Sequence, residues 1–277
     1  MKSIPFWKMS GSGNDFILID HRKPILQPEE MKRFVSKVCR RGLSVGADGV
    51  ILIEPSSRAD YAWRYYNADG GEVEMCGNGS RCAARFAYLQ KIAPAKHTIE
   101  TLAGLVQAEA LGETGERVRV HLPDPSDLRL DLQIEIEGKR HVGHFLNTGV
   151  PHVVYFVEDV EAVDVIGLGR ATRAHPLFAP KGTNANFVGV IDRNNLKIRT
   201  YERGVENETL ACGTGAIAAV LIAAALGKAA SPVSLLTRGE IRLGVRFQQN
   251  GRVFTEIFLE GDARVIYKGE LQEEALL

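Results

Sequence analysis

The sequence lacks an excess of charge of either sign. Its 34 Lys and Arg residues balance 34 Asp and Glu residues, so the formal net charge at pH 7 is zero. Nucleic acids and anionic membrane surfaces are bound through a basic face. The balance therefore argues against nucleic acid and membrane as partners.

Long hydrophobic runs and a cysteine framework are also missing. The longest apolar run, residues 216–226, has eleven residues. That is well short of the roughly 20 that cross a bilayer, so we expect a buried core helix. The first residues show no secretory signal pattern, and four cysteines are too few for a disulfide scaffold. These absences predict a cytoplasmic protein with free thiols.

Glycine is plentiful at 28 residues, which indicates many tight turns. Pro28 opens an amphipathic helical pattern that Gly42 ends, and residues 81–91, 160–174 and 216–226 are expected to form further helices. Strand-like runs occupy much of the remainder. They are 16–20, 50–53, 61–66, 98–102, 105–111, 117–122, 133–137, 141–147, 152–157, 187–190 and 196–201, with a strand-rich tail over 233–267.

A length of 277 residues suggests two domains, since domains average roughly 150 residues. The segment 123–127 has turn chemistry without periodicity, so we place the boundary near it. The last strand is expected to return to the first half. The predicted domains are therefore residues 1–120 plus 263–277, carrying Cys76, and residues 121–262, carrying Cys212.

An internal repeat relates these halves at one fixed shift of 136 positions. The shift places Cys76-Gly77-Asn78-Gly79 on Cys212-Gly213-Thr214-Gly215. Without a gap it also superposes four further pairs, which are Gly13 on Gly149, Gly46-Ala47-Asp48 on Gly182-Thr183-Asn184, Tyr65 on Tyr201, and Ala83 on Ala219. A repeat of this kind indicates a duplicated structural unit.

The predicted fold is α/β, or α+β, with two pseudo-symmetric halves. Residues 216–226 are apolar all round, and such a helix must be covered on nearly every side. The simplest solution is a curled, barrel-like mixed sheet around a central helix in each half, with the active site in the cleft between them. Arg81, Arg85 and Tyr88 give the helix of the first copy a more amphipathic pattern.

Each copy has a cysteine immediately before a glycine-rich helix start. The free amides and partial positive charge of a helix N-terminus should lower the thiol pKa and cradle an anion such as a carboxylate. Two such sites suit inversion at a carbon next to a carboxylate, with one cysteine removing the α-proton and the other delivering a proton to the opposite face. This chemistry needs no cofactor.

The other cysteines and histidines favour simpler interpretations. Cys39 and Cys82 are expected to be packing residues. Cys76 and Cys82 have no second Cys or His pair for zinc, and His141 and His144 would face opposite sides of a strand, so no metal site is predicted.

The motifs resemble those of the diaminopimelate epimerase family over essentially the whole chain. The matching segments are 11–16 (GSGNDF), 67–70 (NADG), 75–82 (MCGNGSRC), 149–152 (GVPH), 182–184 (GTN), 201–204 (YERG) and 208–215 (ETLACGTG). Each is short, but their order and spacing together are highly specific.

The resemblance implies reversible conversion of LL-2,6-diaminopimelate to the meso form without pyridoxal phosphate, supplying lysine and, in most bacteria, peptidoglycan. It implies that Cys76 and Cys212 are the acid–base pair, that His152 and Glu202 tune their pKa values, and that the protein is a cytoplasmic homodimer. The implied substrate-binding residues are Asn14, Asn67, Gly77, Asn78, Asn184, Glu202, Arg203, Gly213 and Thr214. Among them, Gly77, Asn78, Gly213 and Thr214 would hold the reacting carboxylate through main-chain amides, and Arg203 suits a bidentate grip on the distal one.

Two positions depart from the family pattern. Val150 stands where many relatives carry Asn, and Gly49 stands where some carry Gln. Both changes concern recognition of the distal end of the substrate and leave the reacting centre intact.

Three alternatives differ in chemistry. A proline racemase or hydroxyproline epimerase would share the two cysteines but act on a substrate without a second charged end. A phosphate-binding module would place Lys beside the glycine-rich loop, as in Gly-Lys-Ser/Thr, and a thiol redox protein would carry Cys-x-x-Cys; neither pattern occurs. The sequence does not assign the resting thiolate to either cysteine, because coupled sites share their titration.

Overall fold

The computed structural model describes residues 3–277 and divides into two compact units. Unit 1 comprises Met1–Val120 and Gly261–Leu277, and unit 2 comprises His121–Glu260. Asp262 therefore belongs to unit 1, where the main chain and hydroxyl of Ser12 both bind its carboxylate.

Unit 1 is a mixed sheet with two helices. In spatial order its principal strands are β18 (Arg264–Leu271), β1 (Ile4–Gly11), β2 (Asn14–Asp20), β3 (Gly49–Glu54), β4 (Tyr61–Asn67), β6 (Lys96–Thr101), β7 (Gly104–Leu111) and β8 (Arg117–Leu122). The short β5 (Glu72–Val73) pairs with β4. The helices are α1 (Pro28–Val38) and α2 (Gly77–Leu89), and a short 3-10 helix, η2 (Glu273–Leu276), follows β18.

Unit 2 repeats this arrangement. In spatial order its strands are β9 (Ser126–Ile136), β10 (Lys139–Asn147), β11 (Pro151–Phe156), β12 (Asn184–Asp192), β13 (Asn195–Glu202), β15 (Val233–Leu236), β16 (Arg242–Asn250) and β17 (Val253–Asp262). The short β14 (Asn207–Thr209) pairs with β13. The helices are α3 (Val165–Arg173), the 3-10 helix η1 (Pro176–Phe178) and α4 (Gly213–Ala225).

The two units share one strand order and one pattern of directions. The pairs β2–β3 and β4–β6 are parallel in unit 1, as are β11–β12 and β13–β15 in unit 2. Equivalent glycines also share left-handed φ values, +93° at Gly13 and +100° at Gly149, and +72° at Gly46 and +68° at Gly182. The predicted pseudo-symmetric pair of mixed sheets is confirmed.

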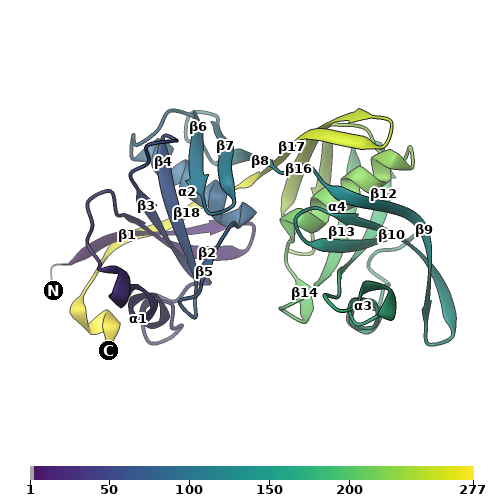
Figure 1. The fold of residues 1–277 in the computed structure, drawn as a ribbon, viewed down its shortest axis with the longest axis horizontal. Coiled ribbons are helices and arrows are strands. Elements are labelled where there is room, and N and C mark those ends of the chain that lie inside the picture. Colours follow the sequence, from purple (N-terminus) through teal and green to yellow (C-terminus); the bar gives the residue numbers. More distant parts are fainter. Residues whose placement is uncertain (1–2) are drawn as a thin grey trace. The chain divides into compact units, whose positions relative to one another are not determined.

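Each sheet curls around one buried helix. In Figure 1, α4 runs among the strands of its own unit, and it contacts β10, β11, β12, β13 and β16. The ten residues from 215 to 224 are all buried. The helix α2 is also covered by its unit's strands, and Arg81 is 0% exposed. Although Arg81 contributes to the amphipathic pattern of α2, its side chain is enclosed with the rest of the helix.

Several element boundaries differ from those that the sequence pattern indicates. The helices α2 and α4 begin at Gly77 and Gly213, four and three residues earlier than expected, because glycine hides the first turn from a pattern based on apolar periodicity. The strand β9 already begins at Ser126, inside the segment assigned to the boundary turn. Its long, half-exposed start lacks the alternation that marks a strand.

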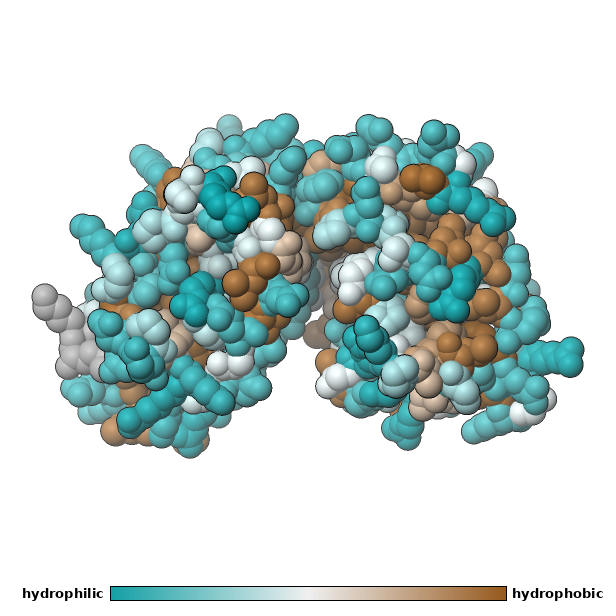
Figure 2. Space-filling model, in the orientation of Figure 1, coloured by the Kyte–Doolittle hydropathy of each residue, from teal (hydrophilic) through white to brown (hydrophobic). Residues whose placement is uncertain are grey.

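Polar side chains cover much of the visible face of each unit, with apolar patches among them (Figure 2). Among residues 3–277, no helix has the length and apolar character that crossing a membrane requires.

The core helix of unit 2 provides a test of this architecture. Leu221 is 0% exposed on α4. We expect Leu221→Ala to lower the free energy of unfolding by about 2–5 kcal/mol, because it removes apolar contacts and leaves a cavity. Urea unfolding followed by circular dichroism measures the change.

The matched control is Leu102→Ala, since Leu102 is 63% exposed. That change should stay within about 0.5 kcal/mol of the parent. Equal effects of the two substitutions would contradict the enclosed position of α4.

Candidate active site

Cys76 is the N-cap residue of α2. Its backbone is extended, with φ −145° and ψ 117°, and its Sγ accepts a hydrogen bond from the Gly79 amide at 3.5 Å. The side chain is only partly buried. The thiol therefore lies at the positive end of the helix, as the sequence predicts, where an anion is stabilised.

A chain of amide side chains lies beside this helix start. Asn78 Nδ2 donates to Asn14 Oδ1 at 2.5 Å, and Asn14 Nδ2 donates to Asp48 Oδ2 at 3.0 Å. Asp48 also accepts from the main-chain amide of Asp15. The structure thus brings together two predicted substrate-binding residues, Asn14 and Asn78, and fixes the orientation of both amides.

Asn67 lies at the end of β4, opposite Gly49 of β3. Its Oδ1 accepts a hydrogen bond from the Tyr65 hydroxyl at 2.8 Å, and the residue is exposed. A Cβ atom at Gly49 would lie 2.3 Å from the Tyr66 carbonyl oxygen and 2.6 Å from the Tyr65 ring. Glycine is therefore required at position 49, and Tyr65 occupies the space that a larger side chain there would need.

Cys212 is the N-cap residue of α4, in the position equivalent to Cys76. Its backbone is also extended, with φ −125° and ψ 112°. Unlike Cys76, it is buried, and its Sγ lies 3.6 Å from the Thr214 hydroxyl. Gly213 and Thr214 form the first turn of α4, and a Cβ atom at Gly213 would lie 2.8 Å from the Leu259 side chain.

His152 connects to Cys212 through Thr214. His152 Nε2 lies 3.0 Å from the Thr214 hydroxyl, and His152 Nδ1 lies 3.2 Å from Asn186 Nδ2. The same Asn186 nitrogen donates to the Val153 carbonyl, so it is the NH₂ group. His152 Nδ1 is therefore an acceptor, and its proton sits on Nε2 and points to Thr214. The Thr214 hydroxyl is then free to donate to the Cys212 sulfur.

Burial keeps this imidazole neutral. It lowers the pKa of the fully buried His152 to about 3, and the positive charge of Arg203 contributes to the decrease. His152 is consequently a neutral hydrogen-bond donor at physiological pH.

The Cys212 thiol differs from the sequence-based expectation. Burial raises its pKa to about 12, and the negative charge of Glu202 adds to the rise. The Thr214 hydroxyl and the main-chain amides of Thr214 and Gly215 act in the opposite direction. Burial and the carboxylate outweigh these donors, so the prediction of a lowered thiol pKa is wrong for Cys212. Burial also raises the pKa of Glu202.

Asn184 and Arg203 meet in unit 2, but their polar groups have partners within the chain. Asn184 Oδ1 accepts from the Arg203 main-chain amide at 2.8 Å, and Asn184 Nδ2 donates to the Pro151 carbonyl at 3.0 Å. The Arg203 guanidinium donates to the Lys181 carbonyl at 2.9 Å. Asn184 thus ties the start of β11, next to His152, to the residue after Glu202.

Asn186 and Thr148 were not among the predicted site residues. Asn186 is fully buried, and a Cβ atom at Gly215 would lie 2.4 Å from its Oδ1, so glycine is needed there. Thr148 Oγ1 donates to the Thr214 carbonyl at 3.1 Å. The alternation of Asn184 and Asn186 along an otherwise apolar strand was the available signal, because residues two apart share a face.

The two remaining cysteines are packing residues, as predicted. Cys39 is buried and belongs to the cluster around α1, and burial raises its pKa to about 12. Cys82 is fully buried, and burial likewise raises its pKa. All four cysteines are free thiols.

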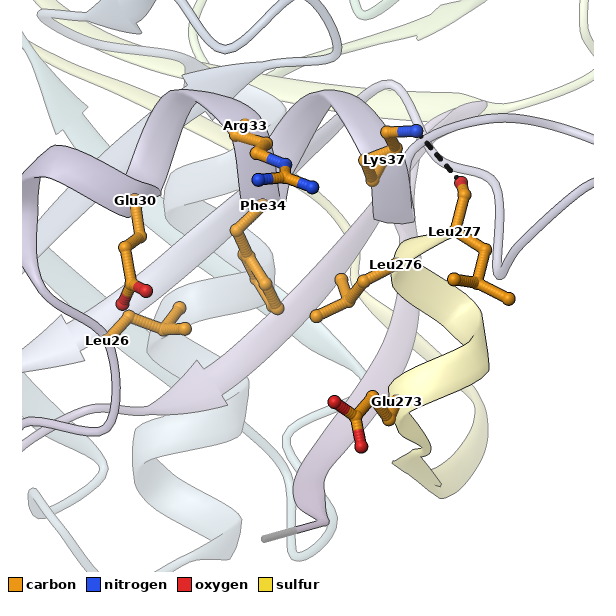
Figure 3. A pocket seen from close by; sticks show the side chains of 8 residues that line it. All are labelled: Leu26, Glu30, Arg33, Phe34, Lys37, Glu273, Leu276 and Leu277. Atoms are coloured by element: carbon orange, nitrogen blue, oxygen red, sulfur yellow. Dashed lines mark hydrogen bonds between the residues drawn. The ribbon is translucent and has the colours of Figure 1, made fainter. Parts of the chain in front are cut away.

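A cavity of about 260 Å³ lies elsewhere in unit 1, between α1 and η2 (Figure 3). Its lining includes Phe34, Leu276 and Leu277, and Lys37 Nζ donates to the Leu277 main-chain oxygen at 3.0 Å. None of the predicted site residues lines this cavity. Within residues 3–277, no three His, Cys, Asp or Glu side chains form a metal-binding group.

The raised thiol pKa gives a testable pH dependence. In a Cys76→Ala chain, we expect alkylation of Cys212 by iodoacetamide to rise about tenfold per pH unit from pH 7 to pH 10, because the thiolate fraction is still growing there. Mass spectrometry of the Cys212 peptide gives the rate. A plateau below pH 8 would contradict the burial effect.

The contribution of Glu202 is tested by adding Glu202→Gln to that chain. Removing the negative charge should lower the thiol pKa and accelerate alkylation at pH 8. Glu206→Gln, an exposed change four residues away, is the control and should leave the rate unchanged.

Comparisons with known proteins agree with the motifs. The family described as "Diaminopimelate epimerase" matches residues 6–126 and 144–266. A diaminopimelate epimerase of Aquifex aeolicus (strain VF5) is 47% identical over 282 aligned positions, covering 99% of both chains. One from Archaeoglobus fulgidus is 43% identical, covering 85% of this chain and 87% of the relative.

Solved structures support the fold. A Bacillus anthracis phenazine biosynthesis protein of the PhzF family has a TM-score of 0.75 at 18% identity, covering 98% of this chain and 100% of that one. A hydroxyproline epimerase from Agrobacterium vitis has a TM-score of 0.71 at 16% identity, covering 98% and 91%. The family match across both halves, with the relatives' identity over nearly the full length, shows that the chain belongs to the diaminopimelate epimerase family and is an isomerase.

Proposed function

We propose that this chain interconverts LL-2,6-diaminopimelate and meso-diaminopimelate by a two-cysteine acid–base mechanism that uses no cofactor. One observation carries the proposal: in a chain of this family, each copy of the duplicated unit starts its central helix with a cysteine at the N-cap. The relatives' names supply the substrate, and the paired thiols supply the chemistry.

In the proposed reaction, the thiolate of one cysteine takes the α-proton from one face of the substrate and becomes a thiol. The thiol of the other cysteine gives its proton to the opposite face and becomes the thiolate. The bond to hydrogen is thus broken on one side of the α-carbon and formed on the other, which inverts the centre. The enzyme regains its starting state when protons are exchanged with solvent or when the reverse reaction runs.

The α-carboxylate takes up negative charge as the proton leaves. We assign its binding to the main-chain amides at the two helix starts, Gly77 and Asn78 in one half and Gly213 and Thr214 in the other. Preorganised amides of this kind usually supply the largest part of the stabilisation of such an anion. Asn14, Asn67, Asn184, Glu202 and Arg203 are assigned to the substrate's remaining charged groups.

His152 and Glu202 are assigned opposite effects on Cys212. His152 holds the Thr214 hydroxyl as a donor to the sulfur, which favours the thiolate. The carboxylate of Glu202 favours the protonated thiol. Cys212 would therefore start as the proton donor and accept the thiolate role only when substrate changes the balance.

The resemblance also predicts a homodimer in the cytoplasm. Analytical ultracentrifugation at micromolar concentration tests the assembly, with a mass of twice 30.4 kDa expected for the dimer. A monomer at all concentrations would contradict it.

The mechanism predicts that each catalytic thiol is required. Cys76→Ala and Cys212→Ala should each lower epimerisation of LL-diaminopimelate at least about 100-fold, because general acid–base transfer contributes roughly that much. Chromatographic separation of the LL and meso isomers measures the reaction, and deuterium incorporation at the α-carbon in heavy water reports removal of the α-proton. Enzyme freed of metal with EDTA and of pyridoxal phosphate with hydroxylamine should keep full activity.

Cys39→Ala is the control for loss of a thiol elsewhere, and it should retain activity in proportion to the folded fraction. Substantial turnover by either catalytic variant would overturn the two-thiol mechanism. The same assay with L-proline tests the alternative function, that of a proline racemase. Activity on proline alone would replace the diaminopimelate assignment.

A further inference from the structure

Arg81 is a buried cation that the proposed mechanism leaves without a role. It is the fifth residue of α2, just past the first turn, and is 0% exposed. Burying a charged guanidinium is costly unless its donors are satisfied and its charge is compensated. A residue of this kind at a helix start calls for an explanation.

Every hydrogen bond that Arg81 makes within residues 3–277 ends on a neutral oxygen. Nη2 donates to the Ser12 hydroxyl at 2.6 Å and to Asn78 Oδ1 at 2.7 Å. Nε donates to the Asp262 carbonyl at 3.2 Å, and Nη1 donates to the Gly77 carbonyl at 3.4 Å. The Asp262 carboxylate is engaged by Ser12 and by Arg264, at 2.8 Å from the Arg264 guanidinium. Each nitrogen of the Arg81 guanidinium has an acceptor, but its charge has no carboxylate in direct contact within the described chain.

These bonds fix two parts of the first half-site. Because Arg81 occupies Asn78 Oδ1, the Asn78 NH₂ group points to Asn14. Ser12 has a left-handed φ of +53°, and its hydroxyl accepts from Arg81 while donating to Asp262. Through its hydrogen bond to the Ser12 hydroxyl, the Arg81 guanidinium therefore fixes the turn that leads to Asn14.

The positive charge also acts on the helix start. Burial lowers the pKa of Arg81, while the negative forms of Cys82, Asp262 and Cys76 raise it and Arg117 lowers it further. On β4, burial raises the pKa of Tyr65, and the negative form of Cys76 adds to the rise. The N-terminal amides of α2 already favour an anion. The buried charge of Arg81, which is hydrogen-bonded to Gly77 and Asn78 of the first turn, strengthens that preference.

The second half-site has no equivalent cation. The shift of 136 positions places Arg81 on Ile217, an apolar and buried residue. The Cys212 thiol instead has the carboxylate of Glu202 beside it and connects through Thr214 to the neutral His152, and the only cation acting on this group in the described residues, Arg203, acts on His152. The two halves therefore share a backbone design but differ in charge.

We propose that Arg81 is a positioning residue that orients Asn78 and the Ser12–Asn14 loop and makes the first half-site, with Cys76, the one that favours negative charge. The expected effect of Arg81 on turnover rests on the proposed function. The expected effect of Arg81 on the reactivity of Cys76 does not, so the role of Arg81 and the proposed function can be tested separately.

The direct test measures Cys76 alkylation by iodoacetamide between pH 5 and pH 10 in a Cys212→Ala chain, with the Cys76 peptide followed by mass spectrometry. Arg81→Met, which removes the charge, should move the midpoint of the profile up by about one pH unit and slow the reaction about tenfold at low pH. Arg81→Lys, which keeps the charge, should leave the midpoint within about 0.3 units. A purely structural role would not separate these two variants.

Arg85→Met is the matched control, because Arg85 lies one turn further along α2 and binds the main-chain oxygens of Thr114 and Ala263. It should leave the Cys76 midpoint unchanged. An Arg81→Met profile that superposes on the parent, or an equal shift in Arg85→Met, would overturn the proposal.

A second measurement requires no buried substitution. The alkylation midpoint of Cys76 in the Cys212→Ala chain should lie at least about one pH unit below that of Cys212 in the Cys76→Ala chain. Equal midpoints would overturn the proposal even if Arg81→Met fails to fold.

The kinetic measurement uses the chain with both cysteines. Arg81→Met should lower kcat/KM for LL-diaminopimelate at least tenfold, and Arg81→Lys should restore part of it. If the parent chain does not act on diaminopimelate, the proposed function fails and the alkylation profiles still decide the role of Arg81. If the parent chain acts on diaminopimelate and Arg81→Met has the same kcat/KM as the parent, the positioning role of Arg81 is overturned and the proposed function stands.

Discussion

The cost of leaving an apolar helix in water governs this molecule. The helix α4 has no polar face, and α2 buries even an arginine, so each requires a sheet that curls almost fully around it. Such enclosure leaves only the helix ends for contact with a ligand. The N-terminal end is the one with free amides and partial positive charge. The position of both cysteines thus follows from the same constraint that shapes the fold.

The same enclosure decides the properties of the thiols. At Cys76 the sulfur is partly accessible and lies near a buried cation, whereas Cys212 is buried beside a carboxylate. Desolvation outweighs the helix dipole at Cys212 because the dipole contributes through a few partial charges, while burial removes the whole hydration of the thiolate. Two N-caps with the same backbone geometry therefore place their thiols in different electrostatic surroundings.

Much of this could be read from the sequence. The repeat was visible because Cys76 and Cys212 each begin a Cys-Gly-x-Gly helix start, and one shift of 136 positions superposes the two. The central helix of unit 2 was visible from its unbroken apolar run. The burial of Arg81 was not, since a charged residue at helical spacing normally indicates an exposed face. Asn186 was missed for a related reason, because its partners His152 and Thr214 come from distant segments that only folding brings together.

The return of the chain to unit 1 has a consequence for biosynthesis. The strand β18 closes the sheet against β1, and Asp262 supplies the acceptors for Ser12 and Arg81, yet both come from the last residues of the chain. A ribosome therefore delivers the second unit in full before the first can close. Synthesis of unit 1 therefore starts before that of unit 2 but ends after it. Until β18 has been synthesised, the edge of β1 that pairs with β18 lacks this partner.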